Sequence, residues 1–198
     1  IALGAGLSIG DAPVPIDAAT LRGFDLVVLD ERAWRALGAG RKATLRDALR
    51  DGLGVLLRVT APLSAADRRE LSELGFTVDA ADIAQTVSLP SARFSAASRA
   101  KNDPSTAADE ERALLLSRQP LRVAAADALA LLRDDAGAPL ASWRSVGQGR
   151  LGLWWLGDTH RLVLAGESAA HGQLSSEAFA TLARHHGREF VHLSVTPE

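Results

Sequence analysis

Two short motifs in the sequence match patterns that carry chemistry in other proteins. The first, GLSIG at Gly6–Gly10, has the G-x-S-x-G spacing of a nucleophile elbow. That elbow exposes its serine on a tight turn between a strand and a helix. Here Asp11–Pro15 follows, and a segment with two prolines cannot begin a helix of that kind. We interpret the match as a coincidence in a stretch rich in glycine and alanine.

The second motif, GQGRLG at Gly147–Gly152, has the G-x-G-x-x-G spacing of a dinucleotide-binding loop. A dinucleotide site needs these glycines to follow a strand and to lead into a helix, whose N-terminus binds the pyrophosphate. Here the glycines lie between two strand-like segments, and the second continues as LWWL at Leu153–Leu156. We therefore predict a hairpin turn at this place, and we expect no cofactor.

The segment Asp158–Arg161 (DTHR) is a better candidate for chemistry. It follows the apolar stretch Leu151–Leu156, so it should lie where a strand ends. Asp158 and His160 together can orient a water molecule or a substrate hydroxyl group. The alternative is structural: Asp158 caps the next segment and Arg161 pairs with a carboxylate elsewhere. We favour this alternative, because the sequence offers no identifiable nucleophile.

Histidine and tryptophan give two further hypotheses. None of the five histidines has H-E-x-x-H or a comparable spacing, so we predict no metal site. The tryptophans are a possible aromatic platform for a carbohydrate; they are Trp34, Trp143, Trp154 and Trp155. Trp154 and Trp155 are adjacent in one strand-like segment and must face opposite sides of it. We expect the tryptophans to pack in the core, with one ring partly exposed.

The composition of this 198-residue chain is that of a globular domain, with 47% hydrophobic and 23% charged residues. Its formal net charge of −2 argues against a nucleic-acid partner, which needs a basic surface. The absence of cysteine excludes disulfides and thiolate catalysis. No segment approaches the ~20 apolar residues of a membrane span. We expect a piece of a longer protein that does not itself insert into a membrane, because the chain lacks a start Met and ends in a linker-like segment.

The first half of the chain alternates strand-like and helix-like segments. Phe24–Leu29 is apolar on both faces, as a buried parallel strand is, and a second such strand is predicted at Val55–Val59. Between them we expect one amphipathic helix. The apolar side of that helix carries Leu37, Leu45 and Leu49.

Capping residues mark two more helices. Asp17 is a suitable N-cap for a short helical turn through Leu21. Ser64, with Asp67 three residues later, resembles a capping box and predicts a helix that ends at Gly75. The resulting β-α-β-α order predicts a parallel sheet with right-handed crossovers.

The second half has a different pattern. We expect a short strand around Gln85–Leu89, a mobile surface loop at Ser91–Asp109 and an amphipathic helix at Ser175–His186. Four strand-like segments separated by turn signals predict hairpins, and they are Leu121–Ala125, Ala128–Arg133, Leu140–Val146 and Arg150–Leu156.

These elements predict one α/β domain over residues 1–198. Its fold is a three-layer sandwich with a flavodoxin-like parallel sheet and added antiparallel strands in the C-terminal half. Ligands of such sheets bind beyond the carboxyl ends of the strands. The residues expected to line that crevice are Asp30, Glu31, Arg58, Thr60, Asp158 and His160.

Three stretches of the sequence resemble class I glutamine amidotransferase-like domains. They are FDLVVLD at Phe24–Asp30, LGVLLRVTAPL at Leu53–Leu63, and the run from Gly147 to Arg184, with its G-x-G-R-L hairpin and final helix. The last run is similar to degenerate members of the family, which occur in large bacterial membrane-anchored proteins. The resemblance does not cover residues 76–119, and its motifs are patterns of strand and turn.

The catalytic residues of the family do not carry over. Its active members hold a cysteine in a G-x-C-x-G elbow after the second strand, where this chain has LRVTA at Leu57–Ala61. The family's His-x-Glu pair has no match, because His160 precedes Arg161 and His171 precedes Gly172. Glutamine hydrolysis through a thioester is therefore excluded. In that alignment Val59 stands at the cysteine position, and Thr60 is the neighbouring hydroxyl that could in principle attack; the sequence identifies no group that would activate it.

The resemblance thus implies a pseudoenzyme, a non-catalytic domain for ligand binding or assembly within a larger, membrane-anchored bacterial protein. Its partners would be other domains of the same polypeptide or a membrane-associated complex. The expected ligand-binding residues are Asp30, Glu31 and Arg58. Two alternatives stay open: a hydrolase that uses Asp158 and His160 at the strand-end crevice, and a carbohydrate-binding module that uses an exposed tryptophan.

Overall fold

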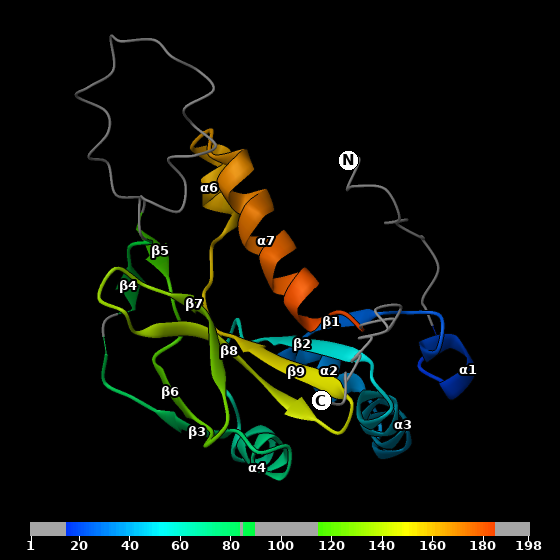
Figure 1. Ribbon diagram of the computed structural model, residues 1–198. Helices are drawn as coiled ribbons and strands as arrows, with labels where there is room; N and C mark the ends of the chain where they lie inside the picture. Colours follow the sequence, from blue (N-terminus) through cyan, green and yellow to red (C-terminus); the bar gives the residue numbers. More distant parts are fainter. Residues whose placement is uncertain (1–14, 84, 90–114, 185–198) are drawn as a thin grey trace, which may run out of the picture.

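A five-stranded sheet forms the centre of the molecule in the computed structural model, which describes residues 15–83, 85–89 and 115–184 (Figure 1). The strand order is β1-β2-β9-β8-β7. These strands are β1 (Leu26–Asp30), β2 (Gly54–Arg58), β7 (Leu129–Arg133), β8 (Pro139–Val146) and β9 (Gly149–Trp154). β1, β2 and β9 are parallel, whereas β8 is antiparallel to both of its neighbours. The predicted fold class, a parallel α/β sheet with antiparallel strands added from the C-terminal half, is confirmed.

Helices cover both faces of this sheet. They are α1 (Ala18–Leu21), α2 (Glu31–Ala36), α3 (Ala39–Arg50), α4 (Ala65–Glu73), α6 (His160–Leu164) and α7 (Ser168–Leu182). Figure 1 shows α7 across one face, with α3 and α4 on the other. Alternate residues of β2 accordingly enter different hydrophobic clusters: Val55 and Leu57 pack with α1–α4, and Leu56 packs with α6 and α7.

Trp154 and Trp155 repeat this alternation at the end of β9. Trp155 lies in the cluster with α1–α4, and Trp154 lies in the cluster with α6 and α7. Both rings are buried. The prediction that the two side chains face opposite sides is confirmed.

Two small antiparallel sheets flank the central one. They pair β3 (Thr77–Ala80) with β6 (Leu121–Ala124), and β4 (Thr86–Val87) with β5 (Leu116–Ser117). The predicted hairpins β7–β8 and β8–β9 are present. A hairpin between β6 and β7 is not formed, because β6 pairs with β3 and turns its apolar residues toward the core beside α4.

The strand predicted at Phe24–Leu29 forms as β1, but the expectation that it is buried was wrong. β1 is the edge strand of the sheet and pairs with β2 alone. As a result, Phe24 is 40% exposed and Val28 is 42% exposed. An apolar run predicts a strand, but it does not distinguish an edge strand from a central one.

The single helix predicted between β1 and β2 is divided in two. Leu37 ends α2 in an extended conformation, with ψ of 120°, and Gly38 is the N-cap of α3. Gly38 and Gly40 lie at the break, and glycine has a low helix propensity. Leu45 and Leu49 are buried on α3 as predicted, whereas Leu37 lies outside that helix.

The predicted helix starts and the Gly147 turn are confirmed. The Asp17 side chain accepts a hydrogen bond from Thr20 N, and Ser64 with Asp67 forms a complete capping box. Gly147 has a φ of 63° in the turn between β8 and β9. The last helix begins earlier than predicted, at Ser168.

Several predictions fall on residues outside those described: the motif at Gly6–Gly10, the loop at Ser91–Asp109, and the end of the last helix at His185 and His186. Within the described ranges, no helix has the length and apolar character needed to cross a membrane.

Candidate functional site

Hydrogen bonds between Glu31 and Thr60 connect the segments that follow β1 and β2. Glu31 is the first residue of α2, directly after β1, and Thr60 follows β2 by two residues. One carboxylate oxygen of Glu31 accepts the Thr60 N–H at 2.8 Å, and the other accepts the Thr60 hydroxyl at 2.9 Å. Glu31 is only 1% exposed. A buried carboxylate therefore receives two donors from Thr60 in the loop after β2.

Thr60 is held on its other side as well. The Gln119 side chain donates to the Thr60 carbonyl oxygen at 2.9 Å, and Gln119 N donates to the Trp155 carbonyl oxygen at 2.9 Å. Among the described non-glycine residues only Asp158 has a positive φ, so Thr60 does not lie on a strained turn of the nucleophile-elbow kind. Hydroxyl nucleophiles are normally activated by histidine or an amine. No histidine or lysine in the described part contacts Thr60.

Asp30 and Arg58 lie side by side at the ends of their strands, in register. Asp30 Oδ1 accepts the Ala33 N–H at 2.7 Å and so caps α2, and Arg32 Nε lies 3.6 Å from Asp30 Oδ2. Arg58 is half-buried on the sheet face that Leu56 shares. Its guanidinium makes no hydrogen bond or ion pair with any residue in the described ranges. The strand ends therefore carry one cation that has no partner within the described part.

Asp158 lies at the end of β9 and bonds to Ser117. Its Oδ2 accepts the Ser117 hydroxyl at 2.7 Å, and its φ is 52°, a conformation that aspartate tolerates better than most residues. His160 begins α6 with an exposed side chain. No hydrogen bond or ion pair between described residues joins Asp158 to His160. The structure thus places the two predicted residues in one segment but directs Asp158 toward Ser117.

The structural alternative for this segment is only partly right. The Asp158 carbonyl oxygen accepts the Arg161 N–H at 2.8 Å, but the N-cap of α6 is Thr159. Arg161 donates to the carbonyl oxygen of Leu115 at 3.1 Å and not to a carboxylate. Every residue has a backbone carbonyl group, so the sequence does not show which one Arg161 will donate to.

Trp143 is the one tryptophan that is not buried. It lies in β8, with the Arg150 guanidinium 4.9 Å from its ring centroid. It also lines a groove of about 720 Å³ between α7 and the edge strand β7. Polar side chains in this groove are Arg133, Glu177 and Thr181.

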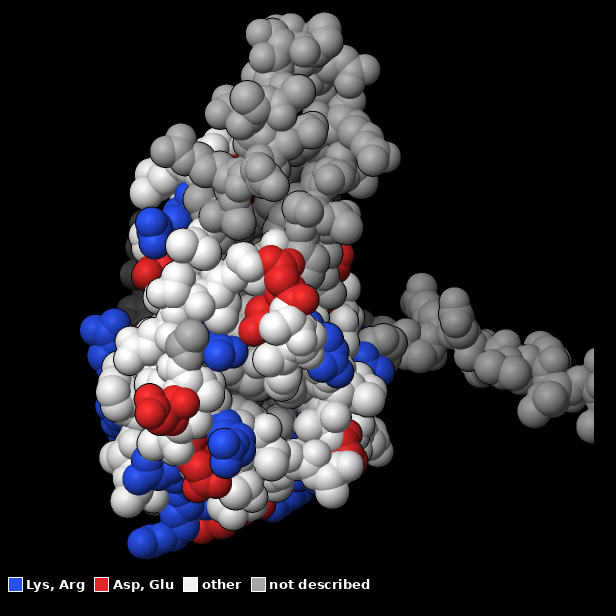
Figure 2. All heavy atoms as spheres, turned by 90° about the vertical axis from the view of Figure 1, so that its left-hand side faces the viewer, with Lys and Arg blue, Asp and Glu red and all other residues white. Residues whose placement is uncertain are grey.

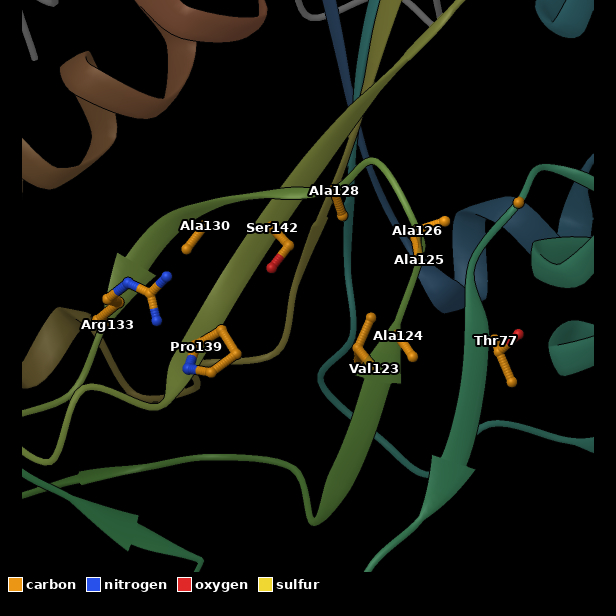
Figure 3. A pocket seen from close by; sticks show the side chains of 11 residues that line it. Thr77, Val123, Ala124, Ala125, Ala126, Ala128, Ala130, Arg133, Pro139 and Ser142 are labelled. Atoms are coloured by element: carbon orange, nitrogen blue, oxygen red, sulfur yellow. The ribbon is translucent and has the colours of Figure 1, made fainter.

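A second hollow, of about 500 Å³, lies on the opposite side of β7 and β8, next to the β3–β6 sheet. Figure 3 shows its lining, which is rich in alanine. Ser142 from β8 and Arg133 from β7 are polar exceptions in this lining. Neither residue was among the sequence candidates, because nothing in the local sequence relates the alanines near 124–130 to Ser142.

Metal-binding groups indicate no further site in the described part. The face in Figure 2 shows acidic and basic side chains interspersed. Among residues 15–83, 85–89 and 115–184, no three His, Cys, Asp or Glu side chains are grouped so that they could hold a metal ion.

No protein-family model and no curated protein matches the sequence. Among solved structures, the chain is similar to the cytoplasmic protein STM1381 from Salmonella typhimurium LT2, with 15% identity and a TM-score of 0.52. It is also similar to the cytoplasmic protein STM3548 from Salmonella typhimurium, with 14% identity and a TM-score of 0.50. Each match covers 86% of this chain and 76% of the other. At these identities the likeness shows the fold alone.

An exo-β-1,4-mannosidase from Opitutaceae bacterium strain TAV5 also matches, with 16% identity and a TM-score of 0.49. That match covers 81% of this chain and 26% of the mannosidase.

Proposed function

We propose that this chain is a non-catalytic, amidotransferase-like domain that binds a ligand or a partner within a larger, membrane-anchored bacterial protein. The observation that carries the proposal is the bond between Thr60 and Glu31. Val59 stands where the family has its nucleophile, and the hydroxyl and N–H of the next residue, Thr60, both donate to the buried Glu31 carboxylate. This contact fixes the loop after β2, and no described histidine or lysine forms a hydrogen bond with the Thr60 hydroxyl.

The side chains at the strand ends support binding more than reaction. Asp30 is used as a helix cap, Glu31 as a loop clamp and Asp158 as the acceptor of Ser117. The Arg58 guanidinium donates no hydrogen bond to any other described residue. Arg58 lies at the strand ends, where ligands of α/β sheets bind. The ligand that this arrangement favours carries a negative charge.

Activity assays test the non-catalytic part of the proposal. The purified chain is incubated with L-glutamine and with p-nitrophenyl acetate, beside Thr60→Ala, His160→Ala and the matched control Thr44→Ala. We expect no ammonia or nitrophenol release above a protein-free blank. Turnover that Thr60→Ala or His160→Ala abolishes and Thr44→Ala preserves would overturn the proposal, and loss in His160→Ala alone would favour the hydrolase.

Titration with an anion tests the ligand-binding part of the proposal. Titration of the ¹⁵N-labelled chain with inorganic phosphate should shift amide signals around Arg58 and Thr60. Arg58→Gln should remove these shifts, and Arg68→Gln on α4 should keep them, because both variants change the net charge equally. Shifts that are unaffected by Arg58→Gln would contradict a ligand role for Arg58.

The half-exposed Trp143 supports a second candidate, a carbohydrate-binding module. Its ring lines a groove that also holds Glu177 and Thr181, and sugars bind proteins through aromatic faces combined with polar groups. Binding of soluble oligosaccharides, followed by tryptophan fluorescence, should be lost in Trp143→Ala. Retained binding in that variant would exclude the groove as the sugar site.

A further inference from the structure

The alanine-lined hollow is a built feature of the fold. It lies between the β7–β8 part of the central sheet and the small β3–β6 sheet, and its volume is about 500 Å³. This volume is within the range of small-molecule sites in proteins, roughly 300–1,000 Å³. The hollow adjoins the Trp143 groove at β7, where Ala130 and Arg133 line both, and it shares no residue with the strand-end site around Arg58 and Thr60.

Small side chains create the space. Most of the lining side chains are small and apolar, and they belong to Val123, Ala124, Ala125, Ala126, Ala128, Ala130 and Pro139. In Figure 3 these residues come from both sides of the hollow, with Ala124 on β6 and Ala130 on β7. A leucine at Ala128 would occupy space that alanine leaves open. The walls therefore present methyl groups to whatever enters.

Ser142 places a hydroxyl group on the wall of this hollow. The residue is only 7% exposed, and its side chain forms no hydrogen bond with any described residue. Figure 3 shows the hydroxyl pointing from β8 into the hollow. The oxygen is not among the buried polar atoms that lack a partner, so solvent reaches it through the hollow. The hydroxyl is thus available to a bound molecule.

Arg133 supplies a positive charge at the same place. Its Nη1 donates to the Gly137 carbonyl oxygen at 2.7 Å, and it forms no ion pair with a described carboxylate. In Figure 3 the guanidinium points toward the space between Ala130, Ser142 and Pro139. Arginine has five N–H donors, so several remain for a ligand. The other nearby arginine, Arg144, is already neutralised by Asp127, at 2.9 and 3.1 Å.

We propose that this hollow binds a small amphipathic carboxylate, whose apolar body is about the size of one aromatic ring. The body lies against the alanine methyl groups, the carboxylate pairs with the Arg133 guanidinium, and the Ser142 hydroxyl donates a hydrogen bond to it. No lining residue is acidic, so nothing in the lining competes for the cation. Arginine and carboxylate match in geometry, and such a pair is stronger than a bond between neutral groups.

The test uses phenylacetate and its neutral isostere phenylacetamide as probes on the full chain. Binding is followed by chemical shifts of ¹⁵N-labelled protein, and signals from residues 123–130 and 142 should move. We expect phenylacetate to bind at least 5-fold more tightly than phenylacetamide. Arg133→Gln should abolish this preference, whereas Arg122→Gln, which removes an exposed charge from the neighbouring strand β6 outside the hollow, should leave it intact.

A substitution that fills the hollow is the second part of this test. Ala128→Leu should prevent binding of both probes, and Ala43→Leu on the exposed side of α3 should not. Folding of each variant is checked by the dispersion of its amide spectrum, and Arg133→Gln keeps the test valid if Ala128→Leu does not fold. The proposal is overturned if phenylacetate does not bind, if its shifts map elsewhere, or if Arg133→Gln leaves the preference for the carboxylate unchanged.

Discussion

The carboxylate of Glu31 holds both the N–H and the hydroxyl of Thr60, 29 positions further along the chain. This contact connects the start of α2 to the loop that follows β2. It also gives the Thr60 hydroxyl a fixed partner, the buried Glu31 carboxylate.

Glu31→Gln should destabilise the chain by about 1–3 kcal/mol, the cost of leaving a hydrogen-bonding group without its partner. A glutamine side chain has one acceptor oxygen, so its NH₂ group would face one of the two Thr60 donors. Urea unfolding at neutral pH measures the change. The control is Glu73→Gln, which affects an exposed pair with Arg46 at 3.3 Å and should cost less than about 0.5 kcal/mol. Equal stability of Glu31→Gln and wild type would contradict a clamping role.

Asp67 makes the stability depend on acid pH. Burial opposes ionisation of this carboxyl group, but hydrogen bonds from Arg35 and Ser64 outweigh burial, and the pKa of Asp67 lies below its ordinary value. The unfolded chain therefore binds more protons than the folded chain just below pH 4. The contribution of Asp67 is complete above that pH and is lost as the pH falls through its folded-state pKa.

Asp67→Asn should consequently lower the free energy of unfolding by about 1–2 kcal/mol at pH 7, because the asparagine amide cannot accept all of these bonds. The difference from wild type should shrink when urea unfolding is repeated at pH 5, 4 and 3. Asp51→Asn, at an exposed carboxylate, is the control and should show no such convergence. A difference that stays constant down to pH 3 would show that ionisation of Asp67 is not what stabilises the fold.

Local features of this fold could be predicted from the sequence, and contacts between distant segments could not. The Ser64–Asp67 capping box and the Gly147 turn depend on residues a few positions apart, and both are present. The position of β9 between β2 and β8 depends on packing over the whole chain. The pairing of β6 with β3 was missed for the same reason, since its register joins Thr77 to Ala124 across 47 positions of the chain.

The candidate site shows the same limit. The residues at the strand ends were selected correctly as neighbours, in that Asp30 and Arg58 are in register and Glu31 meets Thr60. Their roles were not predictable, because Asp30 and Glu31 are equally acidic and adjacent, yet one caps a helix and the other binds a loop. No pattern in the sequence predicted that the Ser117 hydroxyl would donate a hydrogen bond to Asp158.

Close packing at Gly149 gives a prediction with an internal control. A Cβ atom at Gly149 would overlap the carbonyl oxygens of Leu49 and Leu53, which are backbone atoms and cannot move aside without shifting α3 or β2. Gly149→Ala should therefore cost about 3 kcal/mol. Gly172 lies inside α7, where an added Cβ atom would meet no described neighbour within 4 Å, so Gly172→Ala should stabilise the chain by about 0.5–1 kcal/mol. Thermal unfolding of the two variants should show shifts of opposite sign, and shifts of the same sign would contradict the packing at Gly149.

Glu70 connects three helices through Trp34 and Lys42. Its Oε2 accepts the Trp34 indole N–H at 2.7 Å and lies 2.8 Å from Lys42 Nζ, and that ammonium lies 5.1 Å from the centroid of the Trp34 ring. Because Trp34 is buried, Glu70→Ala leaves the indole N–H without a partner and should cost about 2–3 kcal/mol.

Glu70→Gln should cost less than Glu70→Ala, about 1 kcal/mol, because the amide oxygen can still accept the indole N–H while the ion pair is lost. A double-mutant cycle between Glu70→Ala and Lys42→Ala isolates the coupling between the carboxylate and the ammonium. We expect that coupling to exceed the one measured by the same cycle for the more exposed pair Arg46 and Glu73. Equal coupling in the two cycles would mean that the partly buried network around Trp34 contributes no more than a surface ion pair.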